Sequence, residues 1–301
     1  MTMLKSLNSG PSAPKIAYFI MVHHKPAQFD WLLRAIYDPA DLFLVHVDAK
    51  SRLGLKRDRS GVMQGVRDAC AGKPNVRLMR SRFTNWGGWS LSQALLDAIA
   101  IALKADSEWR YFVNLSGQCY PLKPMDVVKR EMDQRGDIAH VQMRPIETLP
   151  SDDWHHRAHP MFETPIRAFI LPGRKKPPHD FAMSYKGSQW TVLPRSFCEW
   201  IVSSATTRRV SAYLKGLLLS DELIMQTLVE NSPYRDRVAD HYGREILWPG
   251  PKLLTMEDLP LLEASPAWFG RKFDAEVDPA VLLALADANG FVPGGLTELA
   301  R

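Results

Sequence analysis

Hydrophobic and polar positions alternate with two different periods along the first part of the chain. Apolar runs over 16–22 and 42–47 have the length of buried strands. Between them, four apolar side chains recur at helical spacing: Phe29, Leu32, Leu33 and Ile36. The same patterns predict further strands over 76–79 and 111–115 and helices over 26–37, 53–71 and 90–104. Because strands alternate with helices, the sequence predicts an α/β fold whose mostly parallel central sheet is flanked by helices.

The pattern changes in the middle of the chain. Residues 144–184 are rich in Pro, His, Asp and Arg and show little periodicity, which predicts irregular structure or an insertion that covers a substrate. Periodic segments then return as a predicted strand over 189–193 and helices over 195–203, 221–230 and 280–289. No repeat or proline-rich linker divides the chain, so one domain is expected, with a strand-poor C-terminal part wrapping over the sheet.

Composition narrows the class of protein. The 301 residues are 46% hydrophobic and 24% charged, which is typical of globular proteins and excludes disordered and fibrous classes. The longest apolar run is far shorter than the ~20 residues that cross a bilayer. The net charge of +5 suits a partner that carries phosphate. The start has no apolar signal stretch and the three cysteines are widely spaced, so a cytoplasmic location and reduced thiols are expected.

Polar residues follow the predicted strands at their carboxyl ends, where open α/β sheets bind ligands. Val22 and His23 end the first strand, and Asp48 follows the second. A carboxylate in that place is typical of nucleotide-binding proteins, in which it accepts a hydrogen bond from a ribose or a base. Asp48 suits a loop or a helix-capping role equally well.

Two predicted helices begin with residues that suit anion binding or general-base catalysis. The segment Asn-Trp-Gly-Gly-Trp-Ser over 85–90 offers the free N–H groups of a helix start to an anion, although a turn with buried tryptophans explains it more simply. Asp221 and Glu222 open another helix, where they serve either as caps or, for a carboxylate that faces a cleft, as a general base. Neither a P-loop nor a GxGxxG motif occurs.

Cationic and histidine clusters each have two interpretations. Arg271 and Lys272 stand between two aromatic residues and suit either a diphosphate or a solvated surface. The basic loop 173–179 suits nucleic acid or a membrane, although such loops are more often simply solvated. His155 and His159 have the spacing of a metal pair but lack a third ligand, so no metal site is predicted.

Six segments in a fixed order carry a resemblance to a known family: AYFIMVHHKPAQFDWLLRAIYDPADLFLVHVDAKS, NWGGWSLSQALLDAI, EWRYFVNLSGQCYPLKP, KGSQWTVLPRSF, SDELIMQTLVENSP and FGRKFD. Over residues 17–274 the chain resembles the core-2/I-branching β-1,6-N-acetylglucosaminyltransferases and peptide O-xylosyltransferases, glycosyltransferase family 14. The resemblance implies a GT-A-type fold and an inverting transfer of a sugar from a UDP-sugar to an acceptor hydroxyl. The family lacks the metal-binding Asp-x-Asp motif, which is absent here too, so a metal-independent reaction is expected.

The resemblance also implies roles for individual residues. Glu222 matches the catalytic base, and Arg271 with Lys272 would neutralise the departing UDP. The residues implied in donor binding are Val22, His23, Asp48, Trp86 and Gly87. Gln189 and Trp190 would flank the sugar and the acceptor. The chain departs from the family at Cys119, where Asp is usual, and at Gly270, where Ala is usual, and the first departure leaves the donor sugar open.

Domain limits and partners follow from the same resemblance. Residues 1–14 are expected to be a flexible N-terminus, and 15–301 a single GT-A-type domain with a nucleotide-binding half (15–125) and an acceptor and catalytic half (126–301). The expected donor is UDP-N-acetylglucosamine, with UDP-xylose second, and no cofactor is expected. The missing anchor and disulfides indicate a bacterial, cytoplasmic member that acts on a glycan or lipid-linked glycan, at most touches the membrane surface, and does not bind nucleic acid. An inactive nucleotide-sugar-binding or glycan-binding protein is the alternative, and the acceptor, the linkage and the oligomeric state stay open.

Overall fold

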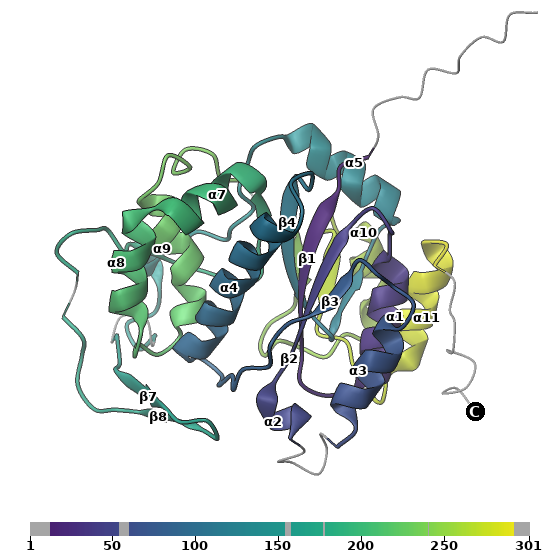
Figure 1. The fold of residues 1–301 in the computed structure, drawn as a ribbon, viewed down its shortest axis with the longest axis horizontal. Coiled ribbons are helices and arrows are strands. Elements are labelled where there is room, and N and C mark those ends of the chain that lie inside the picture. The colour runs from purple at the N-terminus through teal and green to yellow at the C-terminus, as the bar shows by residue number, and fades with distance from the viewer. Residues whose placement is uncertain (1–12, 54–59, 154–157, 177, 240, 292–301) are drawn as a thin grey trace, which may run out of the picture.

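A five-stranded sheet forms the centre of the structure, a computed structural model that describes residues 13–53, 60–153, 158–176, 178–239 and 241–291. The strands follow the order β10-β4-β1-β2-β3 (Figure 1). Their bounds are β1 (Ile16–Val22), β2 (Leu42–Val47), β3 (Val76–Leu78), β4 (Tyr111–Ser116) and β10 (Val192–Pro194). β1 is parallel to β2 and β4, β2 is parallel to β3, and β10 runs antiparallel to β4. The predicted α/β fold with a mostly parallel sheet is confirmed.

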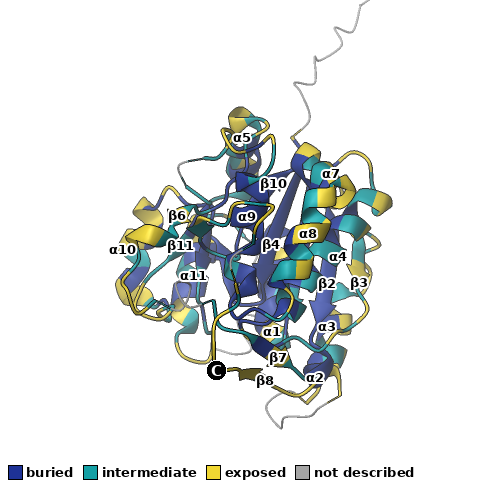
Figure 2. Cartoon of the chain, turned by 90° about the vertical axis from the view of Figure 1, so that its left-hand side faces the viewer, coloured by how far each residue is buried: buried dark blue, intermediate teal, exposed yellow. Residues whose placement is uncertain are grey.

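Successive side chains of β1 point to opposite faces of this sheet and enter two separate cores. Tyr18 and Ile20 pack on one face, and Ala17 and Phe19 pack on the other. Helices that cover the first face are α1 (Pro26–Ile36), α3 (Val62–Cys70) and α11 (Pro279–Ala288). Helices that cover the second face are α4 (Trp89–Ala105), α7 (Arg195–Ser203) and α9 (Ile224–Glu230). The buried strands lie between helices whose outer surfaces are exposed (Figure 2).

Two predicted helices have different bounds in the structure. Of the helix predicted over 53–71, residues 54–59 lie outside the described residues, and α3 begins at Val62, after Gly61 with a φ of 75°. A short separate helix, α2 (Ala49–Arg52), precedes the predicted start. The helix predicted over 221–230 is a 3-10 turn, η3 (Ser220–Glu222), followed by α9, and Leu219 with a φ of 58° precedes that turn. The spacing of hydrophobic residues does not predict such helix ends, because the backbone conformation sets them.

A second sheet of three strands contains the two short strands of the C-terminal part, which is strand-poor as predicted. Its order is β11-β12-β5, with bounds β11 (Arg244–Ile246), β12 (Phe269–Arg271) and β5 (Cys119–Pro121). Each strand has three residues, which is too short to display a period in the sequence. β12 pairs antiparallel with β5, and Arg271 lies opposite Cys119. Since β5 follows β4 directly in the chain, this pairing carries Arg271 to the carboxyl end of the central strands.

The helix α5 (Met125–Arg135) was not predicted from the sequence, because a lysine on its inner face is buried and holds the helix in place. The Lys129 ammonium lies 2.7 Å from Asp38 Oδ2 and 2.8 Å from Asp41 Oδ1. Asp41 Oδ1 also accepts a hydrogen bond from the backbone N–H of Ile16 at 2.9 Å. Burial raises the pKa of Asp41 to about 6, although Lys129 opposes the shift. Because a lysine occupies the inner face of this helix, the hydrophobicity pattern of the sequence does not show a buried helical face. The other elements that the pattern did not predict are α8 (Ala205–Leu214), η4 (Met256–Asp258) and α10 (Leu259–Ala264).

The segment predicted to be irregular, 144–184, contains one small ladder and one strand of a second. β6 (Arg144–Pro145) pairs with β9 (Tyr185–Lys186), and β7 (Met161–Glu163) pairs with β8 (Ala168–Ile170), both antiparallel. A 3-10 turn, η2 (Ile146–Thr148), follows β6. His155 and most of the predicted flexible N-terminus, residues 1–12, lie outside the described residues.

Two chain-wide features bear on the expectations from composition. The three cysteines, Cys70, Cys119 and Cys198, form no disulfide, as predicted. Among the helices in the described ranges, none combines the length and the apolar character that a membrane span needs.

Candidate functional site

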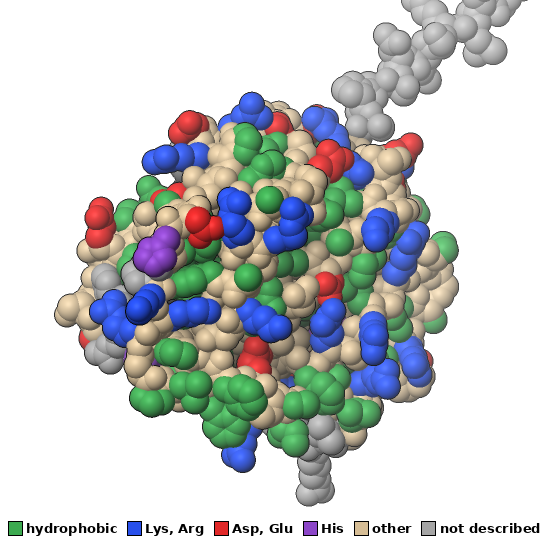
Figure 3. All heavy atoms as spheres, turned by 60° about the vertical axis from the view of Figure 1, so that its left-hand side comes forward, with side chains coloured by type: hydrophobic (Ala, Val, Ile, Leu, Met, Phe, Trp, Pro, Cys, Tyr) green, Lys and Arg blue, Asp and Glu red, His purple; other side chains and the backbone are tan. Residues whose placement is uncertain are grey.

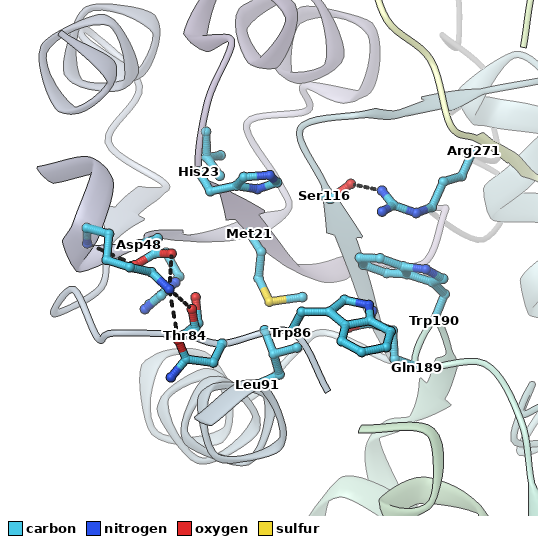
Figure 4. Close-up of a pocket in the computed structure, with 14 residues that line it drawn as sticks. Met21, His23, Asp48, Thr84, Trp86, Leu91, Ser116, Gln189, Trp190 and Arg271 are labelled. Carbon is cyan, nitrogen blue, oxygen red and sulfur yellow. Dashed lines mark hydrogen bonds and ion pairs between the residues drawn. The ribbon is translucent and has the colours of Figure 1, made fainter. Parts of the chain in front are cut away.

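A pocket of about 350 Å³ opens at the carboxyl ends of β1, β2 and β4. Its walls come from the ends of β1 and β2, the loop that precedes α4, the segment before β10 and the end of β12. The predicted site residues that line it are Val22, His23, Asp48, Trp86, Gln189, Trp190 and Arg271. Asp48 and Arg271 lie on opposite sides of the pocket (Figure 4). Residues from distant parts of the chain therefore meet at the edge of the sheet where α/β proteins bind ligands.

Asp48 has the helix-capping role that its sequence position allowed, and it also lines the pocket. One carboxylate oxygen, Oδ1, accepts a hydrogen bond from the backbone N–H of Lys50 at 2.9 Å and so caps α2. The other oxygen, Oδ2, lies 3.8 Å from Lys50 Nζ. Lys50 Nζ also donates to the Thr84 carbonyl at 2.6 Å and to Asn85 Oδ1 at 3.0 Å. Lys50 thus ties the end of β2 to the loop before α4, and the sequence reasoning missed this residue.

Histidines line the same end of the pocket. The rings of His23 and His24 stack with centroids 4.0 Å apart. His46 Nε2 accepts a hydrogen bond from the backbone N–H of Arg82 at 3.0 Å. Burial lowers the pKa of His46 to about 4, so its ring is neutral at physiological pH. His46 was not predicted, although its place two residues before Asp48 on a strand that enters the site is the signal that would have found it.

The opposite end of the pocket is cationic. The Arg271 guanidinium donates to the hydroxyl of Ser116, the last residue of β4, and lies 4.6 Å from the ring centroid of Trp190. Trp190 is buried, so its ring forms a firm wall behind the guanidinium. Ser116 is a second residue that the predicted site did not contain. The pocket therefore has a carboxylate with a neutral imidazole at one end and a held guanidinium at the other.

Three predicted residues lie outside the lining of this pocket. Lys272 follows Arg271 directly, and burial and the neighbouring Arg271 lower its pKa. Gly87 has a φ of 67°, and its carbonyl accepts a hydrogen bond from Leu219 N at 2.6 Å. That bond links the loop before α4 to η3, the turn that carries the third residue, Glu222.

The two acids of η3 have different environments. Asp221 is buried, its Oδ1 has no hydrogen-bond partner among the described atoms, and burial together with the neighbouring Glu222 raises its pKa to about 7. The Glu222 side chain is 31% exposed, and its Oε2 lies 3.4 Å from Lys186 Nζ. The Glu222 carbonyl accepts a hydrogen bond from Gly187 N at 2.9 Å. Of the two acids, Glu222 is therefore the one that reaches solvent and has a cation beside it.

The start of α4, for which the sequence left an anion site as one of two interpretations, binds a carboxylate of the chain itself. Glu163 of β7 accepts hydrogen bonds from the backbone N–H of Ser90 at 3.1 Å and from the Ser90 hydroxyl at 2.5 Å. Asn85 Nδ2 lies 3.3 Å from the same carboxylate. The two tryptophans of this segment differ in burial: Trp89 is buried, and Trp86 is 75% exposed. A negative charge therefore does meet this helix start, but it comes from a residue 73 positions away in the sequence.

A search for metal ligands gives no grouping of three or more His, Cys, Asp or Glu side chains, within the residues that the structure describes. Two predicted site residues take part in ion pairs, Asp48 with Lys50 and Glu222 with Lys186.

Comparisons with known proteins agree on one family. A family model described as Core-2/I-Branching enzyme matches residues 16–260. The chain is 24% identical over 298 residues to human "Probable beta-1,3-galactosyl-O-glycosyl-glycoprotein beta-1,6-N-acetylglucosaminyltransferase 7", covering 90% of this chain and 66% of that protein. It is 27% identical over 215 residues to the Bos taurus enzyme numbered 3 in the same series, covering 71% of this chain and 46% of that protein. The chain thus spans between about half and two thirds of the length of these relatives.

One solved structure with a partial likeness is the apo form of mouse xyloside xylosyltransferase 1. It aligns with a TM-score of 0.40 and 10% identity over 85% of this chain and 97% of that one.

Proposed function

The chain belongs to the Core-2/I-branching enzyme family, and we propose that it is a glycosyltransferase that moves a sugar from a UDP-sugar to an acceptor hydroxyl of a glycan. N-acetylglucosamine is the first candidate sugar and xylose the second. One observation carries the proposal: a pocket at the carboxyl ends of the parallel strands has hydrogen-bond acceptors at one end and Arg271 at the other. This polarity matches a nucleoside diphosphate, which has donors on its base and ribose and negative charge on its phosphates.

The nucleoside would occupy the end of the pocket formed by β1 and β2. Asp48 Oδ2 and the other acceptor groups there would receive hydrogen bonds from the base or the ribose. Because Asp48 Oδ1 is already held by the Lys50 backbone, the carboxylate is fixed before the ligand arrives, which lowers the entropy cost of binding. Val22, His23 and Trp86 line the walls around this end.

The diphosphate would lie toward Arg271. Departure of UDP leaves negative charge on the phosphate oxygen that was bonded to the sugar, and a fixed cation stabilises that charge in the transition state. The Ser116 hydroxyl and the Trp190 ring already orient the guanidinium. We assign Lys272 a supporting electrostatic role, and we propose that the reaction needs no divalent metal.

Glu222 would act as the general base in an inverting displacement. The acceptor oxygen would attack the anomeric carbon and form the new glycosidic bond as the bond to UDP breaks, and the proton of the acceptor hydroxyl would pass to the Glu222 carboxylate. Lys186 orients that carboxylate at 3.4 Å. Gly87 supports the geometry indirectly, since its carbonyl holds Leu219 N beside the turn that carries Glu222. Gln189 and Trp190 would contact the transferred sugar and the acceptor, where an aromatic face suits a pyranose ring.

Binding of UDP without metal tests the donor site. Isothermal titration calorimetry of the full chain with UDP, UMP and a panel of UDP-sugars in excess EDTA should give UDP binding, and the tightest UDP-sugar would name the donor. Arg271→Ala should weaken UDP binding about tenfold to hundredfold, because one charge-assisted contact is lost. Arg130→Ala is a matched control, since Arg130 is an exposed cation of α5 that is paired with Asp126. UDP binding that requires manganese or magnesium would refute metal independence, and no binding under either condition would favour the nonenzymatic alternative.

Turnover tests the base. Glu222→Gln should lower donor hydrolysis or transfer by about a hundredfold to ten-thousandfold while UDP affinity stays within a few-fold. Glu199→Gln changes an acid of α7 that is 55% exposed and serves as the matched control. Retained turnover in Glu222→Gln would overturn the assignment of the base.

A further inference from the structure

The β7–β8 hairpin carries a group of apolar side chains that the fold leaves in solvent. Their exposed fractions are 58% for Phe162, 70% for Ile166, 40% for Phe169, 45% for Ile170 and 42% for Leu171. Phe162 and Phe169 are cross-strand partners, so they emerge side by side from one face of the hairpin. Apolar side chains that gather on a protein surface, rather than being scattered, mark an interaction site.

The hairpin is anchored to the body of the protein and is not a loose excursion. Met161, the neighbour of Phe162, is buried against Leu218 and Leu219. Leu218 N donates to the His159 carbonyl at 3.0 Å, and Met161 N donates to the Gly216 carbonyl at 2.8 Å. The exposed apolar side chains are therefore held in a fixed orientation.

The same segment has a strong excess of positive charge. Residues 160–176 contain four cations, Arg167, Arg174, Lys175 and Lys176, and a single acid, Glu163. The Glu163 carboxylate is already bonded to the start of α4. Arg174 and Lys176 are exposed. Figure 3 shows hydrophobic side chains gathered along the lower part of this face, with a band of Lys and Arg side chains above them.

The hairpin lies next to the mouth of the donor pocket. Asn85, which lines the pocket, donates from Nδ2 to the Thr164 carbonyl at 3.0 Å. Thr164 belongs to the turn between β7 and β8. The adjacent Trp86 also lines the pocket and is 75% exposed. Tryptophan is enriched where proteins meet the boundary between water and lipid.

We infer that the hairpin surface, made of Phe162, Ile166, Phe169 and Leu171 with Arg174 and Lys176, docks on an anionic lipid bilayer. The apolar side chains enter the boundary between headgroups and acyl chains, and the cations face the lipid phosphates. The charge favours a bilayer, because a surface of apolar side chains in a segment with more cations than acids complements negative headgroups. Where the proposed function also holds, on which this last step rests, docking brings the donor pocket to headgroup level and makes the acceptor a membrane-linked glycan.

Vesicle co-sedimentation of the full chain tests the docking surface. We expect binding to vesicles of phosphatidylcholine with about one third phosphatidylglycerol, weak binding to phosphatidylcholine alone, and loss of binding in about 0.5 M salt. The double variant Phe162→Ser/Ile166→Ser should bind at least about tenfold more weakly, because less apolar surface enters the lipid. Leu261→Ser/Val277→Ser is its matched control, since these side chains are 46% and 57% exposed on other parts of the chain.

A second pair of variants tests the charge. Arg174→Gln/Lys176→Gln should weaken binding to the anionic vesicles about 25-fold, at about fivefold for each cation removed. Arg67→Gln/Lys104→Gln removes the same charge from exposed positions on α3 and α4 and should leave binding within about twofold, since it changes net charge alone.

The outcomes separate this inference from the proposed function when UDP binding is measured on the same preparations. Absence of vesicle binding with intact UDP binding would overturn the docking surface alone. Equal binding to neutral and anionic vesicles, or no effect of the hairpin variants, would overturn it as well. A dimer in sedimentation velocity that Phe162→Ser/Ile166→Ser abolishes, without vesicle binding, would assign the surface to a second copy of the chain. Vesicle binding without UDP binding would support the docking surface and refute the membrane-linked acceptor together with the proposed function.

Discussion

Replacing Gly88 with alanine tests whether the Glu163 carboxylate caps the start of α4. A Cβ atom on Gly88 would lie 2.2 Å from Glu163 Oε1 and 2.4 Å from Glu163 Cδ. These separations are far inside van der Waals contact, so the carboxylate must move away. The backbone of Gly88, with a φ of −92° and a ψ of 159°, is open to any residue, so the substitution adds no conformational strain.

The cost follows from the contacts that the carboxylate gives up. Glu163 would lose the bonds to the Ser90 N–H and hydroxyl and to Asn85 Nδ2. Loss of a helix cap costs about 1 kcal/mol, and the charge near the helix N-terminus adds up to about 1 kcal/mol. We therefore expect Gly88→Ala and Glu163→Ala each to lower the free energy of unfolding by about 2 kcal/mol.

The double variant separates this explanation from a general effect of alanine at a helix start. Once Glu163 is truncated, the new Cβ meets no carboxylate, so Gly88→Ala/Glu163→Ala should be about 2 kcal/mol more stable than the sum of the single effects predicts. Urea unfolding followed by circular dichroism and tryptophan fluorescence gives the free energies, provided that the m-value is unchanged. Gly117→Ala is the matched control, because its Cβ would lie 3.5 Å from Phe29, an ordinary contact. Additivity of Gly88→Ala and Glu163→Ala within about 0.5 kcal/mol would refute the reasoning.

Two further predictions concern the turn that carries Glu222 and the strand beside it. Burial raises the pKa of Asp221 from 3.8 to about 7, so between these pH values the folded state keeps a proton that the unfolded state releases. The free energy of unfolding therefore falls as pH rises through this range. Asp221→Asn should abolish this fall, which is on the order of 3 kcal/mol between about pH 4.5 and 7.5. Urea midpoints at the two pH values measure this, and an unchanged pH dependence in the variant would contradict it. Gly187→Ala should destabilise the fold by about 2–4 kcal/mol and reduce turnover, because its Cβ would lie 1.9 Å from the Gln142 carbonyl and Gly187 N binds the Glu222 carbonyl. Thermal unfolding and donor hydrolysis measure the two effects, and wild-type values in both would show that the close approach is not needed.

The matched and missed elements have different physical origins. β1, β2 and β4 are buried on both faces and read as continuous apolar runs, so their bounds follow from the sequence. α4 and α7 have apolar positions at helical spacing and were predicted to within one or two residues. α5 was missed because Lys129 is buried against Asp38 and Asp41, and polarity in the sequence ordinarily means exposure.

The site residues divide in the same way. Val22, His23 and Asp48 follow from the rule that ligands bind at the carboxyl ends of strands, which needs only the strands themselves. Arg271, Glu222 and Gln189 came from the resemblance to a family, because nothing in their local sequence distinguishes them from a surface cation, a helix cap and a strand residue. Lys50 and Ser116 were missed, since their roles depend on partners that lie elsewhere in the chain, Asn85 and Arg271. His46 was missed although its place on β2, two residues before Asp48, is a local signal.

The sequence by itself determined the α/β class, the parallel strands and the edge of the sheet at which the pocket lies, because these depend on periodicity along a local stretch of chain. The tertiary structure alone decided which cation enters the pocket and which anion meets the start of α4. Ser116 lies 155 residues before Arg271 in the sequence, and Arg271 reaches it only because β12 pairs with β5. Glu163 reaches Ser90 only because the β7–β8 hairpin folds back onto the loop before α4. Contacts of this kind depend on long-range pairing, which no local pattern of hydrophobic and polar residues encodes.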